Sequence, residues 1–131
     1  MRHEHVLKEY GDNNVLQSTA EGLVVLLYDK CISSIDLSKY WLEKRNIEKT
    51  NEHLIKAQDI ITYLISILDF QYEISGHLEK MYNFVMDLLI MGNIKKDLEK
   101  IELASNMMME MRKTWKEAMV LSKQAKNQKA V

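Results

Sequence analysis

The residues that could carry metal or redox chemistry in this chain are few and poorly spaced for it. A carboxylate-bridged di-iron centre in a helical protein needs two inward-facing Glu-x-x-His pairs. None of the four histidines has a Glu three positions before it. His3 and His5 could hold a metal weakly, although an incidental pair near the start of the chain is the simpler interpretation. We therefore expect no metal and no cofactor.

Reactive and phosphate-binding motifs are equally scarce. Cys31 lies among apolar positions with helical spacing, which predicts a small buried side chain rather than a nucleophile. The sequence contains neither a Gly-x-Gly-x-x-Gly turn nor a Walker loop. The lysines near the C-terminus have no interleaved aromatic residues, which favours a solvated helix end over a nucleic-acid contact. We expect no catalytic residues and a protein that acts by binding.

The composition favours long helices in one cytoplasmic domain. Proline is absent and glycine occurs only four times among 131 residues, so turns are few. The formal net charge of −1 provides no overall field toward nucleic acid or a membrane surface. No apolar run approaches the roughly 18 residues of a membrane span, and the first residues lack the apolar core of a secretory signal. The single cysteine fits a reducing compartment.

Four stretches have apolar residues at spacings of three and four, the pattern of amphipathic helices. We predict helices at 18–44, 47–68 and 74–91 and a fourth from Leu98 onward, with Asn46 and Asp97 as N-caps and Gly92-Asn93 as a helix stop. Short connections between such helices predict an all-α, antiparallel up-down four-helix bundle. The bundle is assigned to residues 18–125, between a short mobile N-terminal segment (1–17) and a polar tail (126–131).

The apolar positions also predict which side of each helix faces the core. In the third helix the inner face is expected to comprise Ile74, Leu78, Met81, Val85 and Leu88. In the second helix the main stripe passes through Leu54, Ala57, Ile61, Leu64 and Leu68. The expected inner face of the first helix comprises Leu23, Leu27, Cys31, Ser34, Ile35, Ser38 and Leu42. The expected buried stripe of the fourth helix comprises Leu98, Ile101, Ala104, Met108, Met111, Trp115 and Met119.

Several helices carry a second apolar stripe. In the second helix it consists of Ile60, Tyr63 and Ile67. Outer apolar positions on the third and fourth helices are Phe84, Met91, Leu103, Met107 and Leu121. A helix that is apolar on two sides needs two neighbours, and one of them can come from another molecule. From the residues alone, a partner-binding groove and ordinary intramolecular packing both remain open, because the nine methionines suit an adaptable surface and a core equally.

Motifs along the chain resemble those of the bacterial flagellin export chaperones, the FliS family. The similarity spans about residues 10–120, and each motif occurs in the family's order and spacing. The matching stretches are Tyr10-Gly-Asp-Asn-Asn-Val15, Ser18-Thr-Ala-Glu-Gly-Leu-Val-Val-Leu-Leu-Tyr-Asp29, Lys56-Ala-Gln-Asp-Ile-Ile61, Met81-Tyr-Asn-Phe84, Asn93-Ile-Lys-Lys-Asp97 and Met111-Arg-Lys-Thr-Trp-Lys-Glu-Ala118. Departures from the family pattern fall at caps and loops: Ala20 replaces a proline, Lys30 a glycine, and Gln71-Tyr72-Glu73 a Gly-Gly pair.

The resemblance implies a cytoplasmic chaperone that binds the disordered C-terminal segment of flagellin. Such a chaperone prevents premature polymerisation and delivers its client to the flagellar export gate for type III secretion, without nucleotide or metal. It further implies that the N-terminal segment, including Tyr10 and Val15, sits on the bundle until flagellin displaces it, and that Tyr10 also helps contact the export machinery. Together with this resemblance, the second stripes predict a groove that binds the client. Its first candidate residues are Ile60, Tyr63 and Ile67, followed by Phe84, Met91, Leu103, Met107 and Leu121.

Two other classes of function remain to be weighed. One is a structural bundle that self-associates through its second stripes and has no client, and a weak homodimer is compatible with either class. The other is a metal or redox bundle, which the missing Glu-x-x-His pairs disfavour.

Overall fold

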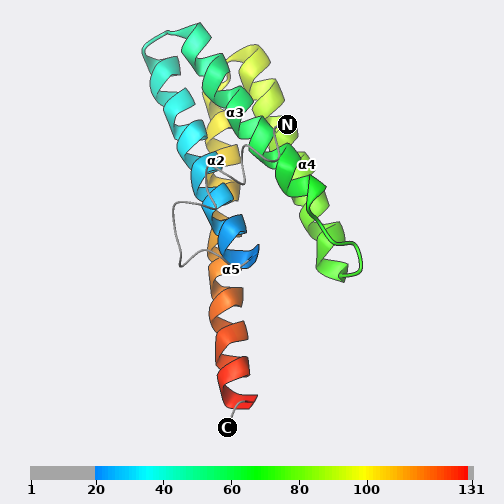
Figure 1. Ribbon diagram of the computed structural model, residues 1–131. Helices are drawn as coiled ribbons and strands as arrows, with labels where there is room; N and C mark the ends of the chain where they lie inside the picture. The colour runs from blue at the N-terminus through cyan, green and yellow to red at the C-terminus, as the bar shows by residue number, and fades with distance from the viewer. Residues whose placement is uncertain (1–19, 130–131) are drawn as a thin grey trace.

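The structure, a computed structural model, describes residues 20–129 as four helices packed against one another (Figure 1). The predicted all-α four-helix architecture is confirmed. The helices are α2 (Ala20–Glu43), α3 (Ile47–Ser66), α4 (Glu73–Lys95) and α5 (Leu98–Lys129). The expected N-terminal segment 1–17 lies outside the described residues. The assignment of 126–131 as a solvated tail stays a prediction, although helix α5 continues as far as Lys129.

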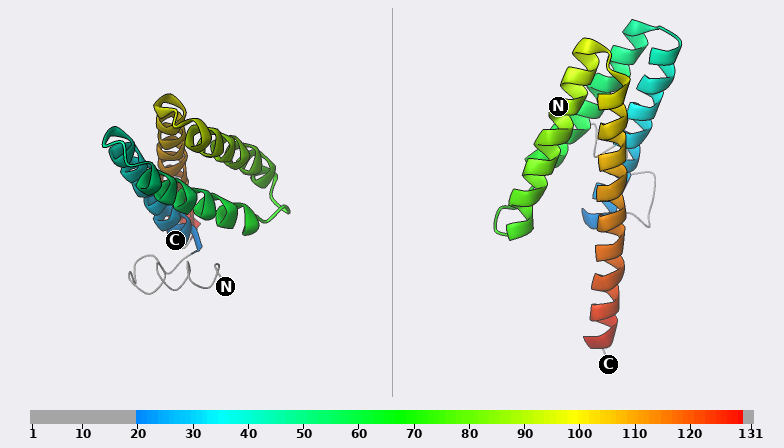
Figure 2. Two further views of the ribbon diagram at one scale, coloured as in Figure 1. Left: turned by 90° about the horizontal axis from the view of Figure 1, so that it is seen from above. Right: turned by 180° about the vertical axis from the view of Figure 1, so that it is seen from behind.

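Successive helices run in opposite directions and form a closed ring of neighbours. Helix α2 packs against α3 and α5, and α4 packs against the same two helices from the other side. The ring is tight at the end that holds the α2–α3 and α4–α5 turns. Toward the opposite end, the α3–α4 hairpin diverges from α2 and α5, and α5 extends beyond the other helices (Figure 2).

The two turns at the tight end are built in the same way. A basic residue with left-handed backbone follows the end of each helix: Arg45 after α2 (φ 59°) and Lys96 after α4 (φ 51°). The next amide then closes the turn by donating to a carbonyl of the last helical turn, as in the Schellman motif. These bonds are Asn46 N to Trp41 O and Asp97 N to Gly92 O, both 2.9 Å.

The residue after each left-handed position caps the following helix. The Asn46 side chain accepts a hydrogen bond of 3.0 Å from the amide of Lys49, and the Asp97 carboxylate accepts one of 3.0 Å from the amide of Glu99. Both caps satisfy donors that an isolated helix start leaves unpaired. The predicted caps are therefore confirmed.

The predicted helix stop at Gly92-Asn93 is wrong, because α4 continues to Lys95. Gly92 does not reverse the chain. Its lack of a side chain allows α4 to approach α5 closely. A Cβ at this position would lie 2.9 Å from Cγ1 of Ile101, on the first turn of α5. Asn93 is buried, and its amide donates to Oδ1 of Asn51 on α3 at 2.7 Å.

The core confirms most of the predicted inner faces of α2, α3 and α5. Cys31 is fully buried, as expected, and its thiol points to the carbonyl of Ala57 at 3.8 Å. The buried apolar cluster comprises Leu27, Tyr28, Cys31, Ile35, Leu54, Ala57, Ile60, Ile61, Tyr63, Leu64, Tyr82, Val85, Leu88, Leu89, Ile101, Ala104, Met108 and Met111.

The predicted inner face of α4 is partly wrong. Ile74 is 59% exposed and Met81 is 39% exposed. The row that faces the core lies about one residue further round the helix and includes Ser75, Tyr82 and Leu89. Helix α4 is apolar on several sides, so the period of 3.6 alone does not determine which side packs.

A pair of tyrosines joins the two helices that face each other across the ring. The hydroxyls of Tyr28 on α2 and Tyr82 on α4 form a hydrogen bond of 2.5 Å, and both side chains are buried. Their rings meet edge to face, with centroids 6.3 Å apart. Burial raises the pKa of Tyr82 to about 12, and burial together with the neighbouring Tyr82 raises the pKa of Tyr28 above its usual range. Both phenols are therefore neutral at pH 7.

Replacing both tyrosines should lower the free energy of unfolding by less than the sum of the two single replacements. Tyr28→Phe or Tyr82→Phe alone removes the tyrosine partner of a buried hydroxyl, at a cost of about 1–3 kcal/mol, whereas Phe at both positions leaves neither hydroxyl in place. Urea unfolding of the two single variants and the double variant should give a loss clearly smaller than the sum of the single losses. Strictly additive losses would show that the hydroxyls do not act as a pair.

The left-handed turn residues offer a second test. Arg45→Gly relieves a steric cost of roughly 1–2 kcal/mol at φ 59°, so its thermal midpoint should rise. Lys96→Gly should gain less, because the Lys96 ammonium donates to Oδ1 and to the carbonyl of Asn93 (2.5 and 2.6 Å) and these bonds are lost. Equal gains, or a loss for Arg45→Gly, would contradict this account of the turns.

Candidate functional site

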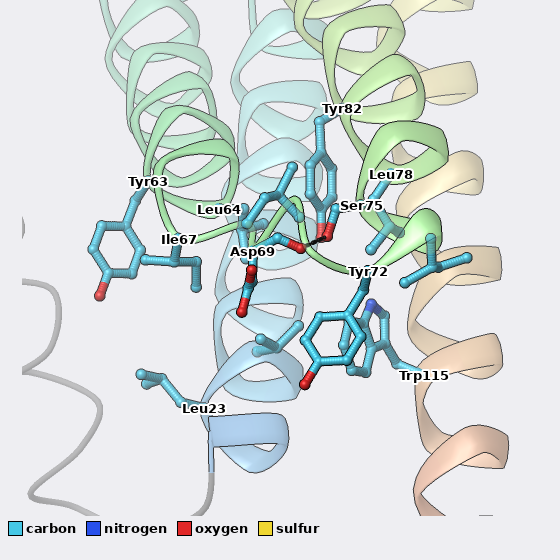
Figure 3. Close-up of a pocket in the computed structure, with 13 residues that line it drawn as sticks. Leu23, Tyr63, Leu64, Ile67, Asp69, Tyr72, Ser75, Leu78, Tyr82 and Trp115 are labelled. Carbon is cyan, nitrogen blue, oxygen red and sulfur yellow. Dashed lines mark hydrogen bonds between the residues drawn. The ribbon is translucent and has the colours of Figure 1, made fainter.

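The divergence of the α3–α4 hairpin leaves a cavity of about 550 Å³ to which all four helices contribute (Figure 3). Its walls are mainly apolar and aromatic side chains, and Tyr82 of the buried pair forms part of them. The lining residues are Leu23, Val24, Tyr63, Leu64, Ile67, Leu68, Asp69, Tyr72, Ile74, Ser75, Leu78, Tyr82 and Trp115. A cavity of this size and character is suited to apolar side chains of a partner.

The α3–α4 connection forms the rim of this cavity and is held by local hydrogen bonds. The Ser75 hydroxyl donates to the Asp69 carbonyl at 2.5 Å (Figure 3), and the amide of Tyr72 donates to the same carbonyl at 3.2 Å. The Asp69 carboxylate accepts from the amide of Gln71 at 3.0 Å. These bonds fix the backbone while the aromatic rings of Phe70 and Tyr72 remain exposed. The rim thus presents large apolar groups to the solvent.

A second cavity of about 390 Å³ lies between α4 and α5. Ile74, Leu78 and Trp115 line both cavities, so the two adjoin across these three side chains. The remaining lining residues of the second cavity are His77, Met81, Glu110, Met111, Thr114 and Ala118. The two cavities together form one extended apolar depression.

The second cavity continues along the outer side of α4 and α5. Spacings of three, four and seven residues place its outer lining residues on the same helix sides as further apolar residues. We call this surface the α4/α5 face. It comprises Ile74, His77, Met81, Phe84 and Met91 on α4 and Leu103, Met107, Glu110, Thr114, Ala118 and Leu121 on α5.

Most of the outer positions predicted from the sequence fall on the α4/α5 face. Phe84, Met91, Leu103 and Leu121 are exposed there. Met107 is half-buried and packs against the core. Outer positions that were predicted on two separate helices thus lie on one surface.

Most of the second stripe of α3 is buried in the bundle, although it was expected to form a surface groove. Ile60 and Tyr63 are each only 5% exposed and belong to the core cluster, whereas Ile67 is 42% exposed. Tyr63 and Ile67 both line the larger cavity. The groove proposed along this stripe is thus reduced to its last turn, because the preceding side chains are buried in the bundle. Tyr10 and Val15 lie outside the described residues.

Sequence reasoning missed several residues of the depression. Ile74, Leu78 and Trp115 had been assigned to inner faces only, and they form the wall between the cavities. The spacing of apolar residues shows which side of a helix is apolar, but not where two helices diverge. The position of these three residues between the cavities could therefore not be predicted from the local sequence. Tyr72 could have been suspected from the sequence, because it is a large aromatic residue in the connection where the family pattern has a Gly-Gly pair.

The polar groups around the depression are few. Among the described side chains, no three from His, Cys, Asp or Glu come together as a metal ion would require. Burial raises the pKa of the Cys31 thiol, which keeps it protonated. Among the described helices, none is both long and apolar enough to cross a membrane.

Comparison with known proteins agrees with the motifs in the sequence. The sequence profile of the family described as "Flagellar protein FliS" matches residues 3–122 of the chain. A "Flagellar secretion chaperone FliS" from Bacillus subtilis (strain 168) is 33% identical over 109 residues, which cover 83% of this chain and 82% of that protein.

Proteins of the same name from two enteric bacteria are more distant. The relative from Salmonella typhimurium is 25% identical over 109 residues, with 81% of each chain covered. The relative from Escherichia coli (strain K12) is 22% identical over 112 residues, which cover 83% of this chain and 82% of that protein. The profile match extends over nearly all of the four-helix domain described above, and the chain belongs to the FliS family of flagellar proteins.

Proposed function

We propose that this protein is a cytoplasmic flagellar secretion chaperone. It binds the disordered C-terminal segment of flagellin, prevents premature polymerisation, and delivers the subunit for type III export. Membership of the FliS family and the names of the relatives support this function. The observation that carries it in the structure is the extended apolar depression formed by two adjoining cavities and the α4/α5 face. The action is binding, without a chemical step.

The depression has the properties that a disordered client needs. A segment that folds on binding loses conformational entropy, and it must bury a large apolar surface to offset that loss. An amphipathic helix laid in an apolar groove does so with side chains at helical spacing. Exposed apolar side chains on α4 and α5 lengthen the groove beyond the cavities. They include Phe84, Met91 and Leu103, and Met107 adds a flexible side chain at its floor.

The delivery step is assigned to the N-terminal segment. By analogy with the family, Tyr10 and Val15 belong to a segment that flagellin displaces from the bundle, and Tyr10 contributes to contact with the export gate. This assignment is supported by the family resemblance of the Tyr10–Val15 motif alone.

A second copy of the chain is the alternative occupant of the same apolar surface. In that case the protein would form a weak homodimer, and the client would compete with the dimer contact. Light scattering with and without the flagellin segment separates the two: a client-binding protein stays monomeric or dissociates on binding, whereas a self-associating structural bundle keeps its oligomeric state.

The α4/α5 face can be tested with paired aspartate variants. Phe84→Asp with Leu103→Asp removes two exposed apolar contacts (50% and 45% exposed) without touching the core. Each lost contact is worth roughly 1–2 kcal/mol when it is buried by a client, so calorimetry with the flagellin C-terminal segment should show binding weakened by at least about tenfold. Circular dichroism and the unfolding midpoint should change little.

The chain offers a matched control for this experiment. Leu37→Asp with Ile55→Asp changes residues of similar exposure (42% and 40%) on α2 and α3 and should leave affinity unchanged. Ile60→Asp should unfold the protein, because Ile60 is in the core. Equal losses in the two surface variants, or unchanged binding by Phe84→Asp with Leu103→Asp, would refute the assignment of the client surface.

A further inference from the structure

We propose that Glu110 makes the α4/α5 cavity selective for a client helix that carries a lysine or arginine beside its apolar stripe. This inference rests on the proposed function, since it concerns the client of that same surface. It adds a charge requirement to a site that the family assignment describes only as a place for flagellin.

Glu110 is the only carboxylate among the described residues that line the cavity between α4 and α5. Met81 and Met111 line the same cavity, and α4 and α5 run antiparallel, which brings this part of α5 alongside Met81. Glu110 is exposed, so its carboxylate lies at the rim of an otherwise mainly apolar wall. The only other ionisable side chain of the lining is His77, nearer the start of α4.

Among the side chains that the structure describes, none forms an ion pair with the Glu110 carboxylate. Thr114, a polar residue of the same lining, donates its hydroxyl to the main-chain carbonyl of Glu110 at 3.1 Å, so this bond does not use the carboxylate. An incoming helix that covers the cavity would remove water from the carboxylate. That loss is unfavourable unless the client supplies a donor, and a cation is the donor that compensates it best.

Lysine and arginine also fit the apolar surroundings. Their aliphatic stems can lie on the exposed Met81 side chain while the charged group reaches the carboxylate at the rim. A client with an acidic residue at this point would place two like charges together beside an apolar wall, which is disfavoured. The cavity thus discriminates between helices of equal hydrophobicity by one charge.

A charge-swap experiment tests this inference. Glu110→Gln should weaken binding of the flagellin C-terminal segment about 3- to 10-fold and reduce its salt dependence, and Glu110→Lys should weaken it further. Each lysine and arginine of the segment is then changed to Glu in turn. One such client variant should bind wild-type protein poorly and regain affinity for Glu110→Lys.

Glu102→Lys is the control, because it makes the same change of charge at an exposed residue of α5 that does not line the cavity and does not share the helix side of the α4/α5 face. It should alter affinity less than about twofold and rescue no client variant. If wild-type protein fails to bind the unmodified segment, the proposed function itself is refuted. If wild-type protein binds but Glu110→Gln binds equally well and no client variant is rescued by Glu110→Lys, only the inference about Glu110 is refuted.

Discussion

The hydrogen bond between Tyr28 and Tyr82 sets the geometry on which the rest of the molecule depends. It joins α2 to α4, and each hydroxyl needs a hydrogen-bond partner inside the protein because both side chains are buried. Tyr82 also lines the larger cavity, so the pair stands where the closed core gives way to open space. The helices are packed together toward the α2–α3 and α4–α5 turns, and the α3–α4 hairpin diverges toward the opposite end (Figure 2).

The two ends of the bundle are stabilised in different ways. At the tight end, left-handed Arg45 and Lys96 reverse the chain, and Gly92 allows α4 to approach α5 closely. Along α5, Arg112 pairs with Asp29 and Ser105 donates to Asp36 at 3.1 Å, so α5 is tied to α2. Toward the open end, α4 and α5 are separated by the second cavity. Apolar surface is consequently left unfilled where a partner can reach it.

The sequence alone predicted the helices, their order and both N-caps, because these depend on local spacing and on side-chain chemistry next to the cap. It failed where the outcome depends on packing. Helix α4 is apolar on several sides, and its core row passes through Ser75 and Tyr82 rather than through Ile74 and Met81. The second stripe of α3 was read as a surface, yet Ile60 is in the core.

The site itself was predicted in parts. Phe84, Met91 and Leu103 were correctly placed on outer sides of their helices, because exposed positions also follow the helical period. The cavities were not predicted, since they arise from the divergence of a hairpin over a distance that no sequence window covers. Trp115, which lies between the cavities, was expected only as a core residue.

The position of Trp115 allows the central claim, that a client fills this depression, to be measured directly. The chain has two tryptophans, and the other, Trp41, packs edge to face with Tyr40 at 5.0 Å near the α2–α3 turn, at the opposite end of the bundle (Figure 1). In a Trp41→Phe variant, tryptophan emission should shift to shorter wavelength when the flagellin C-terminal segment binds, and a Trp115→Phe variant should bind without such a shift. A shift seen only while Trp41 is present, or binding without any change at Trp115, would contradict the account.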